Sequence, residues 1–376
     1  MNIFKCKNLI PVLLILALGC NPTKKAQVSQ VDRQKSSAVT TIAFGSCNRQ
    51  DKPQPLWEPI LSQKPDVFIW LGDIIYGDTE DMGLLKSKYD MQTQQDDYEK
   101  LATTTSVIGV WDDHDYGKND AGKEYPKKKE SRELLYNFLD IPVASPLRER
   151  EGAYSAHLYG KLEEKVKVIL LDARYFRDAL EKAHLYGKLE EKVKVILLDA
   201  RYFRDALEKD AERAYIPNTS GSILGEAQWA WLETELEKKD AAITLIGSGI
   251  QMIPQDHPYE KWENFPQERQ RLLDLLAKTK PNGVLLLSGD RHIAEISKLS
   301  LQGLSHPLYD VTSSGLTHTW NEYREEPNQH RVGDMIAKLN FGLLHFTWEP
   351  NQVKVKMEIR GEDNILYLTE ELIVKK

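Results

Sequence analysis

Short continuous runs of apolar residues predict most of the strands of this chain. Such runs, bounded by polar and turn-forming residues, are typical of strands that are buried on both faces. A second set of stretches at the end of the chain is also strand-like, and it resembles the antiparallel second sheet of a sandwich. Apolar residues at helical spacing predict amphipathic helices over 224–238 and 267–277. The expected strands cover residues 40–44, 66–71, 106–110, 242–246, 284–287, 342–348, 353–359 and 365–368, which together with the helices predict an α/β fold.

Four of these predicted strands stop at a small residue that is followed by potential metal ligands. Ligands of open α/β sheets gather at the carboxyl ends of strands, so we expect these side chains to lie together. A buried strand that ends in several carboxylates needs a neutralising charge, and a bound cation is the simplest one. An acidic, solvated turn is the alternative for the richest of these segments, 111–120. The four segments are Gly45-Ser-Cys47, Gly72-Asp73-Ile-Ile-Tyr76, Trp111-Asp-Asp113-His114-Asp-Tyr-Gly-Lys-Asn119-Asp120 and Ser288-Gly-Asp290-Arg291-His292.

The candidate ligands are chemically mixed. Carboxylate and amide oxygens suit hard cations such as Ca²⁺ or Mg²⁺. A thiolate, a phenolate and an imidazole suit a transition metal. The mixture favours a site with two or more unlike metals, which is the kind of centre that clamps both the attacking and the leaving oxygen of a phosphoryl displacement.

These motifs resemble those of the alkaline phosphatase D family, in the same order from about Thr40 to about Gly315. The resemblance rests on the four strand-end segments, with weaker support from Leu-Leu-Asp-Ala-Arg-Tyr-Phe-Arg, 224–232 and 260–269. It implies a metallophosphatase-like sandwich of two β-sheets flanked by helices. It also implies hydrolysis of phosphate mono- and diesters with ferric iron (Fe3+) and calcium (Ca2+) as cofactors, although a different divalent pair is an alternative.

The resemblance assigns roles to individual residues. Iron would be held by Cys47, Asp73 and Tyr76, with Asp73 bridging to the second metal. His114 takes the place of a histidine that is not a ligand and that faces the leaving group. The Asp-x-His motif that opens many metallophosphatases is replaced here by Gly-Ser-Cys47. Roles at the second metal, or as shared ligands, fall to Asp113, Asn119, Asp290 and His292.

The expected mechanism is an in-line attack of a metal-bound hydroxide on phosphorus, because a metal lowers the pKa of its bound water. His114 would protonate the leaving oxygen. Arg291 would either bind the phosphate bidentately or pair with a nearby carboxylate, and the sequence leaves both open. Of the other histidines, His318 is a candidate for the pocket because it follows Ser313-Ser-Gly315. Taken singly, Cys47 and Tyr76 also have an ordinary use as a small buried residue and an anchored aromatic one.

The N-terminus reads as a targeting segment that lies outside the folded domain. Two lysines precede about ten apolar residues, 9–18, too few to span a bilayer. The following Leu16-Ala-Leu-Gly-Cys20 resembles a bacterial lipoprotein signal that is cleaved before a lipidated Cys20; an ordinary secretory signal is the alternative. We therefore expect a signal peptide over 1–19, a flexible tether over 20–37 and one domain over 38–376, on a membrane-anchored extracytoplasmic lipoprotein. Cys47 would then be the one free thiol.

A 27-residue segment occurs twice without a change, as residues 156–182 and 183–209. Both copies contain the same predicted strand, and one parental position can hold only one of them. The stretch 153–159 can form a hairpin with the strand of copy one. We therefore expect copy one to dock and copy two to be extruded, in which case the chain is a monomer unless the strand is exchanged between molecules. Neither copy carries a proposed metal ligand.

The net charge of −7 and the lack of a basic stripe do not favour nucleic-acid binding. The expected partners are small phosphate esters and, through the lipid anchor, a membrane. The main interpretation is a scavenging phosphoesterase. The alternatives are a phosphodiesterase with a narrow substrate such as a lipid headgroup or wall-polymer fragment, a binding lipoprotein whose metals serve only stability, and a relative inactivated by the duplication.

Overall fold

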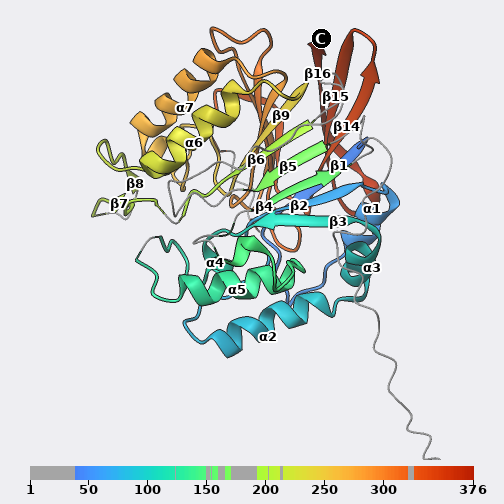
Figure 1. Ribbon diagram of the computed structural model, residues 1–376, viewed down its shortest axis with the longest axis vertical. Helices are drawn as coiled ribbons and strands as arrows, with labels where there is room; N and C mark the ends of the chain where they lie inside the picture. The colour runs from blue at the N-terminus through green and yellow to red at the C-terminus, as the bar shows by residue number, and fades with distance from the viewer. Residues whose placement is uncertain are drawn as a thin grey trace, which may run out of the picture.

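Two β-sheets and the helices that cover them make up the computed structural model (Figure 1). The structure describes residues 39–122, 124–149, 153, 155–159, 166–170, 193–201, 203–211, 215–320 and 326–376. The predicted signal peptide and tether, with Cys20, lie outside these residues. Among the described helices, none combines the length and the apolar character needed to cross a membrane.

The first sheet has six strands and combines the start of the chain with its end. Its parallel half brings together three of the strands whose ends carry candidate ligands. The antiparallel half consists of the C-terminal strands, which were expected to form a sheet of their own but continue the first sheet through pairing of β14 with β1. The strand order is β16 (Leu366–Lys375), β15 (Gln352–Arg360), β14 (Phe341–Glu349), β1 (Thr41–Gly45), β2 (Val67–Leu71) and β3 (Ser106–Val110).

The second sheet has eight strands, and its central strands run parallel. It contributes the fourth ligand-bearing strand end, that of β10. Its order is β13 (Arg331–Ile336), β11 (Ala294–Leu299), β12 (Leu308–Ser313), β10 (Val284–Ser288), β9 (Ile243–Ser248), β6 (Val193–Leu198), β5 (Val166–Leu170) and β4 (Ser155–Tyr159). A short hairpin of β7 (Glu208–Lys209) and β8 (Tyr215–Ile216) stands apart from both sheets.

The two sheets enclose one hydrophobic core, and a second core lies under two helices. Successive residues of β6 alternate between these cores: Val195 and Leu197 belong to the first, Ile196 and Leu198 to the second. This alternation is the two-residue period of a strand, and it explains why the sequence of β6 is apolar throughout. The second core is closed by α6 (Gly225–Glu237) and α7 (Pro266–Thr279), close to the helices predicted from the sequence.

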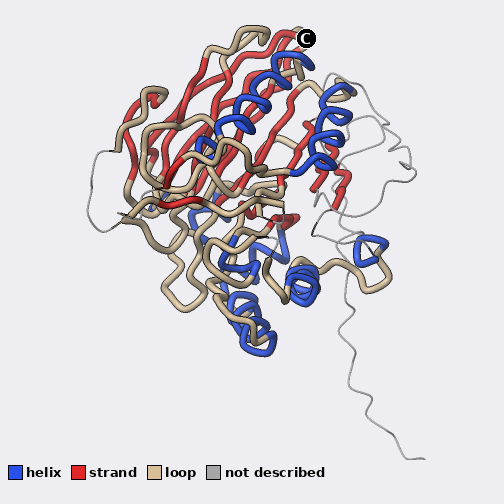
Figure 2. The backbone as a smooth tube through the Cα atoms, turned by 90° about the vertical axis from the view of Figure 1, so that its left-hand side faces the viewer, coloured by secondary structure: helices blue, strands red, loops and turns tan. Residues whose placement is uncertain are grey.

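The remaining helices gather around the first sheet, and Figure 2 shows the helices outside the strand layers. An aromatic cluster joins them to β2, with the ring of Trp57 centred 5.4 Å from Phe68 and 5.5 Å from Trp70. These helices are α1 (Trp57–Ser62), α2 (Met82–Thr93), α3 (Asp96–Thr104), α4 (Asp113–Tyr116) and α5 (Lys128–Phe138). The arrangement confirms the α/β sandwich expected from the sequence.

Both copies of the duplicated segment contribute a strand to the second sheet, so the expectation that copy two is extruded is wrong. The strand of copy two, β6, pairs with β9, and the strand of copy one, β5, pairs with the outer side of β6. The predicted hairpin of copy one with its upstream neighbour is present, because β4 pairs antiparallel with β5. The sheet has accommodated the extra strand because parallel pairing needs only a matching apolar strand beside it, and the copies match residue for residue.

Candidate metal centre

The ends of β1, β2, β3 and β10 meet where the two sheets approach one another. Two glycines permit this approach. A Cβ at Gly289 would lie 2.7 Å from the carbonyl oxygen of Leu71, and a Cβ at Gly72, which has φ of 88°, would lie 2.3 Å from the Cβ of Asp112. Neither space admits a larger residue, so glycine at these strand ends lets the following side chains converge.

Four of the predicted ligands have a left-handed backbone. The φ angles are 56° at Cys47, 49° at Asp73, 66° at Asp290 and 54° at His292. A residue other than glycine adopts this conformation at a cost, and such residues cluster at functional sites. Each of the three segments therefore turns sharply at its predicted ligand.

Four buried or half-buried carboxylates form the centre of the site. Ligand atoms of Asp73, Asp112, Asp113 and Asp290 all lie within 4.8 Å of one another, and those of Asp73, Asp113 and His114 form a second such group. Burial, followed by the charges of Asp113 and Asp112, raises the pKa of Asp73 well above its ordinary value. Burial and the charge of Asp112 do the same to the pKa of Asp290. Burial and mutual repulsion thus oppose the ionisation of Asp73 and Asp290, whereas at Asp113 burial is opposed by the charge of Arg201 and the pKa is lowered; a bound cation would favour the ionised form of all three.

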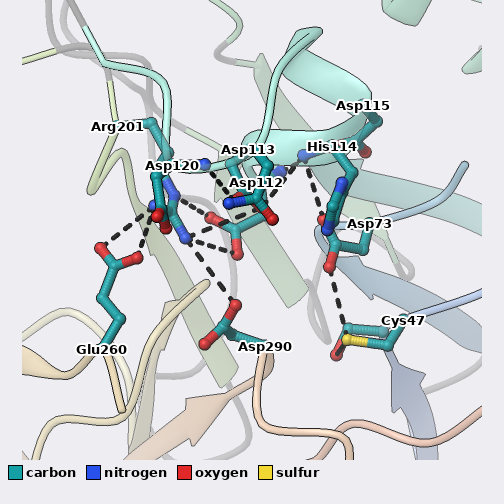
Figure 3. A network of polar contacts seen from close by, with 12 residues as sticks. Cys47, Asp73, Asp112, Asp113, His114, Asp115, Asp120, Arg201, Glu260 and Asp290 are labelled. Carbon is teal, nitrogen blue, oxygen red and sulfur yellow. Dashed lines mark hydrogen bonds and ion pairs between the residues drawn. The ribbon is translucent and has the colours of Figure 1, made fainter. Parts of the chain in front are cut away.

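Cys47 lies at the edge of this cluster (Figure 3). Its Sγ is 3.4 Å from Oδ2 of Asp73 and 3.2 Å from Oγ of Ser314. Burial is the main cause that raises the pKa of the thiol, and the nearby carboxylates of Asp73 and Asp290 add to it. These polar neighbours are unlike the apolar contacts of a cysteine that only fills space.

Tyr76 joins two histidines to the site. Its hydroxyl is 3.0 Å from Nε2 of His292 and 3.0 Å from Nε2 of His318, the histidine that the sequence suggested for the pocket. Burial lowers the pKa of His292 to about 3 and that of His318 to about 4, so both imidazoles are neutral near pH 7. A neutral imidazole is the form that binds a metal.

His114 stands on the first turn of α4, which begins after Asp112. Its Nδ1 lies 2.8 Å from both carboxylate oxygens of Asp78, and its ring is centred 4.1 Å from that of Tyr76. Burial lowers the pKa of His114, but the Asp78 hydrogen bond and the charge of Asp113 outweigh burial, and the pKa is raised. The imidazole is therefore oriented by a carboxylate that favours its protonated form.

Arg201 and Glu260 belong to the site but were not among the predicted site residues. The Arg201 guanidinium donates from Nε and Nη2 to Asp112 at 2.5 and 3.1 Å, and from Nη1 to Glu260 at 3.1 and 2.9 Å (Figure 3). Its Nη2 also lies 3.9 Å from Asp113 and 3.9 Å from Asp290. The Asp-Ala-Arg-Tyr-Phe-Arg motif was the available signal, but the duplication presents it twice.

Two predicted site residues lie elsewhere. Arg291 is buried, forms an ion pair with Glu326 and stacks at 4.2 Å over the ring of Tyr259. Of its two expected uses, the structure shows the pairing with a carboxylate, and the catalytic role of Arg291 stays a prediction. Asn119 is exposed, and its backbone N–H donates to Asp78 at 3.0 Å. The metal role of Asn119 stays a prediction.

The fold and the site together define a two-sheet α/β sandwich with an acidic cluster at its strand ends that could hold a metal ion, the architecture expected of a metallophosphatase. A family model described as PhoD-like phosphatase matches residues 84–340. The chain therefore belongs to the PhoD-like phosphatase family, which confirms the resemblance drawn from the motifs. The match begins after Cys47, Asp73 and Tyr76 in the sequence. In the structure these three side chains lie beside residues of the matched segment, 84–340.

Two individual proteins are similar to this chain. Alkaline phosphatase D of Bacillus subtilis (strain 168) is 23% identical over 314 residues, which cover 73% of this chain and 48% of the relative. The chain thus spans about half the length of this curated relative. A solved structure described as "Structure of PhoD" has a TM-score of 0.64 at 15% identity, over 90% of this chain and 72% of that chain. At this identity the likeness shows the fold alone.

Proposed function

We propose that this chain is a metal-dependent hydrolase of phosphate esters, and that the reaction takes place at the carboxylate cluster. The observation that carries the proposal is the meeting of the cluster with His114. Asp73 accepts a hydrogen bond from the backbone N–H of His114 at 3.4 Å, so the candidate acid stands directly beside the candidate ligands. A centre that served only stability would have no use for a carboxylate-held imidazole at its rim.

The residues present fit a cationic cofactor. Arg201 forms ion pairs with Asp112, Asp113, Asp290 and Glu260, and Arg204 forms one with Glu260, whereas Asp73 adds a fifth carboxylate to the cluster. A multivalent cation, or two, would offset the remaining negative charge. In this proposal the thiol of Cys47, the carboxylate of Asp73 and the phenol of Tyr76 hold ferric iron. Calcium or another divalent ion is held by Asp113, Asp290, His292 and Asn119. Metals bound there supply a Lewis acid for the phosphoryl oxygen and lower the pKa of a water ligand.

The protein's own groups then complete the chemistry. His114, held at Nδ1 by Asp78, gives a proton to the leaving oxygen of the ester. The same carboxylate raises the pKa of His114, which favours the protonated imidazole. The ring of Tyr76 packs against the imidazole and limits its rotation. Proton transfer by a placed side chain contributes roughly a 10²- to 10⁴-fold rate factor.

The test is a comparison of His114→Ala with wild-type protein that carries the same metal load. We expect hydrolysis of both a phosphate monoester and a diester to fall by roughly 10²-fold or more, with metal content unchanged. His306→Ala, at a half-buried position where the ring contacts the carbonyl of Pro307, is the matched control and should retain full activity. Wild-type turnover in metal-loaded His114→Ala would exclude the proposed role of His114, and wild-type protein inactive on both esters would refute the proposed function.

The substrate preference and the location are also proposals. We propose that both mono- and diesters are hydrolysed; a narrow phosphodiesterase would show activity on a diester alone. We further propose that the chain is an extracytoplasmic lipoprotein, on the strength of the Leu16-Ala-Leu-Gly-Cys20 sequence. Labelling with a radioactive fatty acid should mark the wild-type chain in a bacterial host and should fail in Cys20→Ala.

A further inference from the structure

We propose that copy two of the duplicated segment, residues 183–209, is the copy that completes the active site, and that its Arg201 is a positioning residue for Asp112 and Glu260. The two copies have the same sequence, so only their places in the fold can distinguish them. The assignment of Arg201 to the site of hydrolysis rests on the proposed function, whereas its assignment to the metal-binding cluster does not.

The place of β6 in the sheet favours copy two. It pairs with β9 over its whole length, from Val193 opposite Ile243 to Leu198 opposite Ser248, and all six of its residues are buried. β9 in turn pairs with β10, whose end carries Asp290. The strand of copy one, β5, lies one place further from β10, and neighbouring strands are about 4.8 Å apart. The end of β6 is therefore nearer to β10 and the candidate metal centre than the end of β5.

The segment after β6 is fixed by helix α6. Gln228 of this helix accepts a hydrogen bond from the backbone N–H of Asp199 at 3.0 Å and donates one to its carbonyl at 3.0 Å. The carboxylate of Asp199 accepts from the backbone N–H of Arg201 at 2.9 Å. These bonds hold the turn that directs Arg201 into the cluster.

The hydrogen bonds of Arg201 indicate positioning rather than substrate binding. Its Nε, Nη1 and Nη2 all donate to the carboxylates of Asp112 and Glu260, and its side chain is 1% exposed. A planar guanidinium can hold two carboxylates in fixed directions, which an ammonium group cannot do. Arg201 therefore orients Asp112, and through it the four-aspartate group, while it offsets part of the negative charge. Arg204, also in copy two, extends the network by its ion pair with Glu260 at 3.3 Å.

Removal of either copy would yield the same shortened chain, so single substitutions in the full-length protein provide the test. Arg174 is the sequence equivalent of Arg201 in copy one. The pair Arg201→Lys and Arg174→Lys is therefore a matched comparison. For each variant, calcium affinity is measured by equilibrium dialysis, retained iron by elemental analysis, and the kcat and KM for a phosphate monoester and a diester by a steady-state assay.

We expect Arg174→Lys to match the wild type within about twofold in every measurement. Arg201→Lys should lose at least tenfold in calcium affinity and in kcat, with a smaller change in KM, because the fork that orients Asp112 is gone while a positive charge remains. Arg201→Lys with wild-type calcium affinity, or equal losses in both variants, would overturn the proposal. A loss in Arg174→Lys alone would assign the site to copy one instead.

The experiment separates the positioning role of Arg201 from the proposed function. If wild-type protein hydrolyses neither ester but calcium affinity still separates the two variants, the positioning role stands and the proposed function fails. If Arg201→Lys does not fold, Glu260→Gln replaces it, since this change loosens only the Nη1 side of the guanidinium. A calcium affinity lowered several-fold in Glu260→Gln would support the positioning role, and an unchanged affinity would overturn it.

Discussion

Lys194 of copy two carries a buried positive charge, and its removal tests the position of β6 by stability alone. The Lys194 side chain is 4% exposed and forms an ion pair with Asp240; its Nζ also lies 3.8 Å from Oε2 of Glu235 and donates to the Glu235 carbonyl at 2.8 Å. Lys194→Met keeps the length of the side chain but leaves the Asp240 carboxylate buried without this cation. Loss of one partner of a buried ion pair costs about 3–5 kcal/mol.

The matched control is Lys167→Met, the same substitution in copy one. Lys167 is opposite Lys194 in the register of β5 and β6, but Asp240 and Glu235 already have Lys194 as their partner. We expect this variant to lose less than about 1 kcal/mol, because the Asp240 carboxylate keeps its ion pair with Lys194. The double variant Lys194→Met with Asp240→Leu should regain most of the loss, because an apolar pair can replace a buried ion pair at little cost.

Urea unfolding followed by tryptophan fluorescence measures all three variants, with the midpoint as the readout. A loss of stability in Lys194→Met that is several times that in Lys167→Met is the expected result. Equal losses would refute the reasoning about copy two, and a larger loss in Lys167→Met would mean that copy one lies beside β9.

Two further predictions concern the candidate metal centre. Cys47→Ser replaces a thiolate by a hydroxyl, and we expect iron retention, measured by elemental analysis, to fall at least tenfold. The melting temperature of the metal-free protein, measured by calorimetry, should change little. Full iron retention would remove Cys47 from the ligand set. Asp78→Asn removes the carboxylate that raises the pKa of His114, so this pKa falls. Because protonated His114 is the active form, the alkaline limb of the pH–kcat profile should move to lower pH, and an unmoved limb would mean that another group is the acid.

The direction of the His114 pKa shift also determines how the pairing with Asp78 changes stability with pH. The pKa of His114 is raised on folding, so its pairing with Asp78 stabilises the protein fully below the unfolded pKa of about 6.5 and is lost as pH rises through the higher folded value. Asp78→Asn should therefore reduce stability at acid pH more than at alkaline pH. This stability effect and the shift of the alkaline limb have the same origin and should appear together.

The strands that position the site could be predicted from sequence because their apolar runs are short and clearly bounded. β3 was predicted at its observed bounds, Ser106–Val110, and β10 within one residue. The convergence of Cys47, Asp73 and Asp113 followed from one rule, that ligands gather at the carboxyl ends of parallel strands. Neither prediction needed to know which strands are neighbours.

The features that could not be predicted depend on which strands and side chains become neighbours in the fold. The apolar pattern of β14 identifies a strand but carries no signal that its partner is β1, about 300 residues earlier in the chain. The two copies of the duplicated strand are identical, so only the contact with β9 distinguishes them. Arg201 could not be assigned for the same reason. Its partners Asp112 and Glu260 are distant in sequence, and an arginine becomes recognisable as a positioning residue only when its carboxylates are seen around it.

The most direct test of the account is the metal content of purified full-length protein, read together with its visible spectrum. We predict iron together with a second metal in each chain, a violet band from ferric iron bound to the phenolate of Tyr76, and loss of both metals and of phosphoesterase activity in Asp73→Asn, since Asp73 is the proposed bridge. Colourless protein that contains no iron and hydrolyses phosphate esters at full rate would contradict the iron assignment. Full activity in Asp73→Asn would contradict the central claim that these converging strand ends form the catalytic centre.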